Sequence, residues 1–181
     1  MSYQTIAEIY DGNAKVRAKL KQTIENLTDE QLNFRMNEDS WTTREIVEHI
    51  SIVEGGIAGI CARLLQKSVE ENLPNDGSAN ISVEFLTKSG SAADRRTTKL
   101  QAPDRVKPGG TFSIEESFAK LQENSEKLDQ IRTGLETVNT QNAKFPHPHF
   151  GDMTATEWLL LIGGHERRHI DQIEEILECV K

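Results

Sequence analysis

Three of the five histidines combine a residue type and a spacing that suit metal binding. His165 and His169 are four residues apart in a segment with helical periodicity, so their side chains lie one turn apart on one helix face. That face also carries Ile162 and Ile173, and an imidazole left unpaired among such residues would cost about 1–3 kcal/mol. His49 occupies an equivalent position, flanked by apolar residues, in a second helical segment. The pattern predicts a site made of three histidines from two helices.

Three neutral imidazoles can hold one divalent ion and leave its other coordination positions open to water or substrate, as a catalytic site requires. Imidazole suits Zn, Ni, Cu and Fe(II), and we expect Zn or Ni here. An ion held in this way lowers the pKa of a bound water or thiol, which predicts either thiol transfer or hydrolysis. The spacing is one residue longer than in the H-E-x-x-H motif of zinc proteases. Glu166 is therefore expected to point away from the ion, into a surface salt bridge.

Other polar residues are candidates for supporting roles. His147 and His149 alternate with prolines ahead of the last helical segment, which favours a rigid turn over a role in substrate binding or acid–base chemistry. Gln172 follows His169 by three residues and is a candidate to hydrogen-bond a ligand histidine or the bound water, with polar packing in the core as the alternative. Glu54 is a further candidate for a general acid or base.

Four amphipathic helices are predicted to position these residues. They span about residues 2–26, 40–66, 113–135 and 154–180, and residues 27–32 predict a helix stop followed by a short capped turn. Thr42 with Glu45, and Thr154 with Glu157, form capping boxes at two of the helix starts. Trp41, next to one of these starts, is expected to pack in the core or as a hydrophobic staple.

The segments between these helices differ in length. Residues 67–111 lose the periodicity and form a long connection, with a short helix at about 81–89, that joins parallel neighbours or covers the site. Residues 138–152 are expected to be irregular, because Pro146 and Pro148 forbid a helix. No strand-like alternation persists. Gly55, Gly56 and Gly59, inside the second helix, are expected to allow close helix packing. The fold class predicted is all-α, a four-helix bundle with a long connection between helices 2 and 3, in one domain over residues 1–181.

The composition excludes several functions. A chain of 181 residues with a formal net charge of −8 is a poor candidate for nucleic-acid binding, and its one basic pair, Arg95-Arg96, is expected to be a solvated turn. The two cysteines, Cys61 and Cys179, are expected to be small, partly buried apolar residues. Without a signal peptide or a stretch long enough to span a membrane, the expected location is the cytoplasm.

Three separate motifs resemble the DinB/YfiT-like superfamily of metalloenzymes. They are residues 41–49 (WTTREIVEH), 150–158 (FGDMTATEW) and 165–173 (HERRHIDQI), and their order extends the resemblance over nearly the whole chain. The resemblance implies a four-helix bundle in which His49, His165 and His169 bind the metal. Relatives in this superfamily include S-transferases that use bacillithiol or mycothiol and a mycothiol-dependent maleylpyruvate isomerase. It therefore also implies a small-molecule substrate, a low-molecular-weight thiol as co-substrate and a homodimer.

Three hypotheses follow for the function. The first is a metal-dependent enzyme, thiol S-transferase-like or hydrolase-like, with thiol transfer slightly favoured. The second is a non-catalytic protein that binds a metal or a small molecule, for example in a stress response. The third is a helical dimerisation module whose histidines only pack. Metal analysis of His49→Ala and His169→Ala variants separates the third hypothesis from the other two.

Overall fold

Hydroxyl residues define where most of the helices begin. The computed structural model describes residues 3–71, 73–93 and 101–180, and in five helices the N-cap Thr or Ser and a Glu or Gln three residues later form a complete capping box. These helices are α1 (Ile6–Ile24), α2 (Asp29–Asn33), α3 (Thr43–Val69), α5 (Ile114–Thr137) and α6 (Ala155–Cys179). The predicted boxes at Thr42 and Thr154 are confirmed. The first helix starts at Ile6 rather than near Ser2 because Thr5 and Glu8 cap it there.

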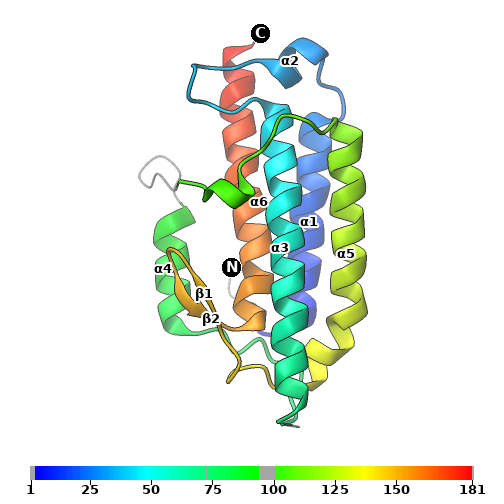
Figure 1. Ribbon diagram of the computed structural model, residues 1–181, viewed down its shortest axis with the longest axis vertical. Coiled ribbons are helices and arrows are strands. Elements are labelled where there is room, and N and C mark those ends of the chain that lie inside the picture. Colours follow the sequence, from blue (N-terminus) through cyan, green and yellow to red (C-terminus); the bar gives the residue numbers. More distant parts are fainter. Residues whose placement is uncertain (1–2, 72, 94–100, 181) are drawn as a thin grey trace.

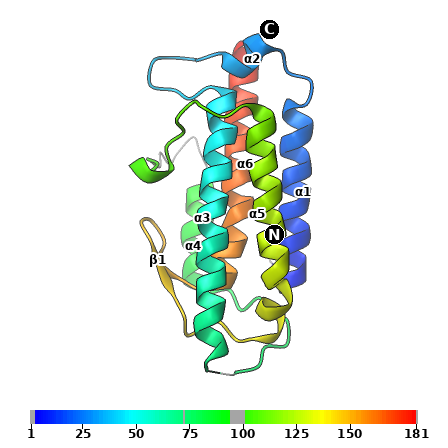
Figure 2. The same ribbon diagram turned by 45° about the vertical axis from the view of Figure 1, so that its right-hand side comes forward.

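The four long helices α1, α3, α5 and α6 lie side by side (Figures 1 and 2). Helix α3 packs against α5 and α6, and α1 packs mainly against α6. Helices α3 and α5 run in the same direction, so the chain must return along the bundle between them (Figure 1). The predicted four-helix bundle with a long connection between its second and third long helices is confirmed. Among the described residues, no helix has the length and apolar character to cross a membrane.

A polar layer divides the apolar core into two clusters. One cluster contains Ile9, Ile57 and Leu159, and the other contains Leu20, Ile50 and Ile170. Between them, each of three helices contributes one charged residue to a shared ion-pair network: Arg17 from α1, Glu54 from α3 and Glu166 from α6. The three histidines lie on α3 and α6 at neighbouring positions. The apolar clusters therefore fix the relative positions of the helices on both sides of the polar groups.

The connection between α3 and α5 contains α4 (Val83–Ala93) and the short 3-10 helix η1 (Asp104–Val106). The start of α4 is attached to the start of α6 by Glu157, which is almost fully buried. The Oε1 atom of Glu157 accepts a hydrogen bond from the Ser82 N–H at 3.1 Å, and its Oε2 atom accepts one from the Thr154 N–H at 2.9 Å. The capping box of α6 thus also anchors α4. The Arg95-Arg96 pair lies outside the described residues.

A β-hairpin precedes α6, so the prediction of an irregular segment without strands is wrong. Strand β1 (Phe145–His147) pairs antiparallel with β2 (Gly151–Met153). The two prolines prevent a helix but not a short strand pair, and Gly151 accepts a φ of +79° at the turn. With three residues each, the strands are too short to produce a detectable alternation of apolar and polar residues.

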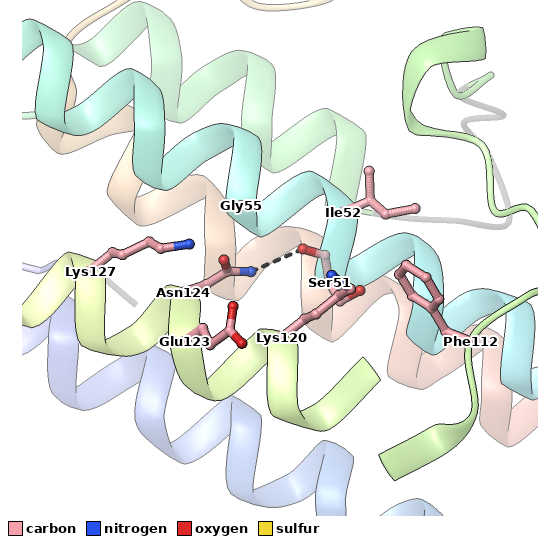
Figure 3. Close-up of a pocket in the computed structure, with 8 residues that line it drawn as sticks. All are labelled: Ser51, Ile52, Gly55, Phe112, Lys120, Glu123, Asn124 and Lys127. Carbon is pink, nitrogen blue, oxygen red and sulfur yellow. Dashed lines mark hydrogen bonds between the residues drawn. The ribbon is translucent and has the colours of Figure 1, made fainter. Parts of the chain in front are cut away.

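Two smaller predictions need correction. Of the three glycines in α3, only Gly55 faces a close neighbour: a Cβ atom there would lie 3.2 Å from Oδ1 of Asn124, while Gly56 and Gly59 face open space. Asn124 donates a hydrogen bond to the Ser51 carbonyl at 3.0 Å, beside a pocket of about 220 Å³ between α3 and α5 (Figure 3). The pocket lining includes none of the histidines. Cys61 is buried as predicted, but Cys179 is exposed near the end of α6.

Candidate metal centre

The three predicted histidines come together between α3 and α6. The Nε2 atom of His165 lies 3.2 Å from Nε2 of His49 and 3.2 Å from Nε2 of His169. One nitrogen from each ring falls within a group whose members are all within 4.8 Å of one another. His49 and His169 are buried and His165 is half-buried, so the group is exposed mainly at His165. The helical spacing of His165 and His169 is what allows both rings to face His49.

The protonation of two of these rings follows from their outer hydrogen bonds. The Nδ1 atom of His49 lies 2.6 Å from the Val106 carbonyl, and Nδ1 of His169 lies 3.0 Å from Oε1 of Gln172. Both partners are oxygen acceptors, so each Nδ1 carries the proton and donates it. The Nε2 atom of each neutral ring is then an unprotonated lone pair that faces His165. Gln172 thus hydrogen-bonds His169, a contact that its spacing of three residues suggested.

A proton on Nε2 of His165 can donate to only one of these two lone pairs, whereas a cation between the rings can bind all three nitrogens. The 3.2 Å separations fit such a cation. With metal–nitrogen bonds of about 2.0–2.1 Å, neighbouring nitrogens around a tetrahedral zinc ion are about 3.3–3.4 Å apart. Outer hydrogen bonds from Nδ1 to a carbonyl oxygen are also typical of metal-binding histidines, because they fix the ring orientation. The donor set and its spacing therefore fit a divalent metal ion.

The electrostatic environment favours the neutral form of His49 and His165. Burial lowers the pKa of His49, although its bond to Val106 opposes the shift. Burial also lowers the pKa of His165 well below its usual range, and the positive charges that His169, His49, His147 and Arg168 can carry add to this effect. A neutral imidazole is the form that binds a metal, so the lowered pKa values of His49 and His165 favour metal binding at neutral pH.

A loop from the long connection supports His49, and we name residues 103–111 the strap. The strap includes η1, whose last residue supplies the carbonyl that contacts His49. Glu48, the residue before His49, is buried, and its Oε1 accepts hydrogen bonds from the Gly109 N–H at 3.0 Å and the Thr111 hydroxyl at 3.4 Å. Two adjacent residues of α3 thus bind the same loop. The sequence pattern predicts that this segment is not a long helix. It does not predict that the segment folds back against His49 and Glu48.

Replacing Glu48 with alanine should weaken metal binding without removing a ligand. Without the carboxylate the strap loses two hydrogen bonds to α3, and the Val106 carbonyl no longer fixes the ring of His49. Loss of a supporting interaction of this kind typically lowers metal affinity about 10–100-fold. Competition with a chromophoric chelator measures the affinity. Glu70→Ala, at an exposed position near the end of the same helix, is the control and should leave it unchanged. Equal affinities in both variants would contradict a supporting role for the strap.

Trp41 lies beside the histidine group as well as against the core. It packs against the apolar cluster that contains Ile46, as predicted for a residue that precedes a helix cap. Its ring centroid is also 4.7 Å from that of His49 and 6.4 Å from that of His169. Trp41 is half-buried, so it forms one wall of the site that a bound molecule can contact.

Glu54, the acid–base candidate, and Glu166 both bind Arg17 rather than the histidines. Arg17 donates from Nε to Glu166 at 2.6 Å and from Nη2 to Glu54, in the polar layer of the core. Glu166 does point away from the histidine group, but it is buried, so the expected surface salt bridge is wrong. Burial raises the pKa of Glu54 to about 7 and also raises that of Glu166, despite the attraction of Arg17. No sequence pattern indicates that Arg17, on another helix, is their common partner.

His147 and His149 lie at the tip of the hairpin. His147 is half-buried, with its ring 5.2 Å from that of Trp158, while His149 is exposed in the turn. His147 is close enough to the histidine group to lower the pKa of His165. The rigid-turn interpretation describes the backbone here. Of the two histidines, His147 is the one whose charge would lower the pKa of His165.

Comparison with known proteins places this architecture in a family. A model of the DinB superfamily matches residues 14–173. Over 168 residues the chain is 27% identical to YuaE, an uncharacterised protein of Bacillus subtilis (strain 168), with 92% of this chain and 96% of YuaE covered.

Two solved structures have a similar fold. TT2238, a four-helix bundle protein, has a TM-score of 0.63 and 20% identity, with 94% of this chain and 99% of that chain covered. YfiT from Bacillus subtilis is described as a probable metal-dependent hydrolase with an unusual four-helix bundle topology. Its TM-score is 0.58 at 22% identity, with 99% of this chain and 89% of that chain covered. These likenesses confirm the fold.

Proposed function

The chain belongs to the DinB superfamily, and on that basis we propose that it is a metal-dependent enzyme whose centre is formed by His49, His165 and His169. The observation that carries this proposal is the convergence of three Nε2 atoms at a spacing that fits a divalent cation, Zn or Ni by expectation. Such an ion acts as a Lewis acid and makes hydroxide or thiolate available near neutral pH. The expected small-molecule substrate, homodimer, cytoplasmic location and single domain remain predictions.

We propose that the nucleophile is a low-molecular-weight thiol, which the enzyme transfers to an electrophile. A free thiol has a pKa of about 8.5, so a small shift makes it a thiolate, and no general base is required. Hydrolysis makes a larger demand on the ion, because the pKa of water must fall from about 15.7 to about 7, much further than that of a thiol. Among the described residues, the buried carboxylates Glu54 and Glu166 are engaged with Arg17. Glu48 binds the strap through Oε1, while its Oε2 has no hydrogen-bond partner.

Hydrolysis is the second candidate because of the structural likeness to YfiT, itself described as a probable metal-dependent hydrolase. The two reactions differ in their requirement for a thiol. An activated ester or amide turned over at the same rate with and without thiol would favour hydrolysis. A product that contains the thiol, formed from an electrophile only when both are present, would favour transfer.

Purified protein loaded with Zn or Ni should turn over a thiol and an electrophile such as monochlorobimane, and the rate should depend on the metal. His165→Ala is the matched inactive variant, and His149→Ala, an exposed histidine outside the group, should retain activity. Product formation is followed by fluorescence and confirmed by mass spectrometry. Tight metal binding with no turnover of thiol–electrophile pairs or activated esters would contradict the enzyme proposal and favour a non-catalytic metal-binding protein.

A further inference from the structure

The pocket of about 220 Å³ between α3 and α5 is lined mostly by polar residues (Figure 3). Its lining consists of Ser51, Ile52 and Gly55 from α3, Lys120, Glu123, Asn124 and Lys127 from α5, and Phe112, which lies at one end. None of the three histidines proposed to bind the metal belongs to this lining. The pocket is therefore a separate place in the fold where a molecule can bind.

The floor of the pocket contains a hydrogen-bond acceptor that has no partner. Asn124 is only 5% exposed, and its Nδ2 atom donates a hydrogen bond to the Ser51 carbonyl at 3.0 Å. In the part of the chain that the structure describes, its Oδ1 atom accepts no hydrogen bond. The unpartnered side-chain oxygens of Thr43, Glu48 and Ser117 are fully enclosed, but this one is not. A molecule in the pocket can therefore donate a hydrogen bond to Oδ1 of Asn124.

A glycine on the facing helix keeps this acceptor uncovered. A Cβ atom at position 55 would lie 3.2 Å from Oδ1 of Asn124, whereas a Cβ atom at position 56 would meet nothing within 4 Å. Any side chain at position 55 would press on the oxygen and occupy the space beside it. Glycine is unfavourable inside a helix, and at position 55 it preserves the pocket.

Two lysines on one face of α5 bring positive charge to the pocket. Lys120 and Lys127 are both exposed and lie seven residues apart, which is about 10 Å along the helix axis. The Nζ atom of Lys120 lies 4.8 Å from the centre of the Phe112 ring. Glu123 stands three and four residues from the two lysines, the spacing of helical ion pairs, yet among the described residues it pairs with neither. Both ammonium groups are thus available to an anion.

We propose that this pocket binds a small dicarboxylate that carries a hydroxyl group between its two acid groups. The two carboxylates match the two separated lysines, and the hydroxyl donates its hydrogen to Oδ1 of Asn124, which lies between them along α5. The carboxylate of Glu123 disfavours a third negative charge in the middle of the ligand. The site goes beyond the proposed function, because it requires neither the metal nor the histidines.

Glutarate and 3-hydroxyglutarate are matched probes, since they differ only in the middle hydroxyl group. Titration of ¹⁵N-labelled protein at constant ionic strength, followed by ¹H–¹⁵N NMR, locates the binding site and measures the affinity. With 3-hydroxyglutarate, the side-chain amide of Asn124 and the backbone amide of Gly55 should shift. Glutarate should bind about threefold more weakly, because one neutral hydrogen bond is lost. The His165→Ala variant should give the same affinities as the wild type.

Replacement of both lysines tests the charge requirement. The double variant Lys120→Gln with Lys127→Gln should bind 3-hydroxyglutarate about tenfold more weakly, because two charge-assisted contacts are lost. The double variant Lys15→Gln with Lys21→Gln is the matched control. It removes the same charge from two exposed positions on α1 and should leave the affinity unchanged.

A pair of neighbouring glycines tests the shape of the pocket. Gly55→Leu should abolish binding, because its side chain occupies the space beside Asn124, whereas Gly56→Leu faces open space and should bind as the wild type does. Circular dichroism checks that both variants fold. If Gly55→Leu does not fold, the double lysine variant still tests the proposal.

Three results would overturn this inference. They are the absence of shifts at Asn124 and Gly55 with 3-hydroxyglutarate, an unchanged affinity in the double lysine variant, and equal affinities for the two probes. Shifts confined to the surroundings of His165 and lost in His165→Ala would assign the dicarboxylate to the metal centre and overturn the pocket as its site. Failure of the metal centre to bind metal or turn over a substrate would leave the expected titrations unchanged, so the two proposals fail independently.

Discussion

Alanine at position 165 should abolish stoichiometric binding of a divalent metal. His165 is the central member of the group, with its Nε2 atom 3.2 Å from the Nε2 atoms of both His49 and His169. Its removal leaves two nitrogen donors, too few to retain an ion against competing chelators. The affinity should fall by more than the roughly 10–100-fold that follows from the loss of a supporting hydrogen bond. Elemental analysis after loading with Zn or Ni and desalting measures the change.

The metal-free stability of the same variant provides an internal check. In the absence of an ion, the half-buried ring of His165 makes at most one hydrogen bond to a neighbouring histidine, so His165→Ala should unfold at a temperature close to that of metal-free wild type. His149→Ala, at an exposed position, should keep full metal content. If the wild type itself bound no stoichiometric metal, or if His165→Ala bound as much as the wild type, the histidines would be packing residues only.

The largest effect on stability is expected from Arg17→Met. Arg17 is the common partner of Glu54 and Glu166, whose side chains are only 3% and 1% exposed. The substitution leaves both carboxyl groups buried without a cation, and removal of one partner from a buried ion pair typically costs about 3–5 kcal/mol. Urea unfolding followed by circular dichroism measures the free energy of unfolding. Arg167→Met removes an exposed pair with Asp171 and should cost about 0–1 kcal/mol.

The effect of Arg17→Met should depend on pH in a defined direction. In the wild type, burial raises the pKa of Glu54 from 4.5 to about 7 and that of Glu166 in the same direction. The folded state therefore binds more protons than the unfolded state, so this contribution to stability is complete below about pH 4.5 and is lost as the pH rises through 7. Without Arg17 both pKa values rise further, and the loss extends to higher pH. The variant should be destabilised more at pH 8 than at pH 5.

A second substitution tests the cause of that difference. Glu54→Gln in the Arg17→Met background removes one of the buried charges and should restore part of the stability at pH 8, with little effect at pH 5. An Arg17→Met variant that loses the same free energy at both pH values would show that its packing, rather than its charge, accounts for the cost.

Local signals in the sequence were sufficient to predict the bundle and to propose its histidine group. The Thr-x-x-Glu boxes at Thr42 and Thr154 act within one turn, so a short stretch of sequence contains the whole signal. The apolar register of His49, His165 and His169 likewise depends only on helical periodicity. Both kinds of pattern lie within single helices, so recognising them requires no knowledge of the contacts between helices.

Contacts between distant segments could not be predicted in this way. The carbonyl of Val106 has no side-chain signature, so no residue type marks it as the partner of His49. Glu166 stands beside two arginines in the sequence, which suggests a solvated position, yet its partner is Arg17 on another helix. These interactions depend on tertiary packing, which determines both the direction in which each group points and how deeply it is buried.

The distance along the chain between the ligand candidates adds a thermodynamic consequence. His49 and His165 are separated by 116 residues, and only the packed arrangement of α3 and α6 brings them within reach of one ion. A shared cation would therefore act as a reversible cross-link that closes a very long loop, the situation in which a cross-link restricts an unfolded chain most. Because the unfolded chain cannot assemble the three nitrogens, occupancy and folding would form one linked equilibrium. A substitution that loosens the polar layer around Arg17 would then weaken metal retention without touching a ligand.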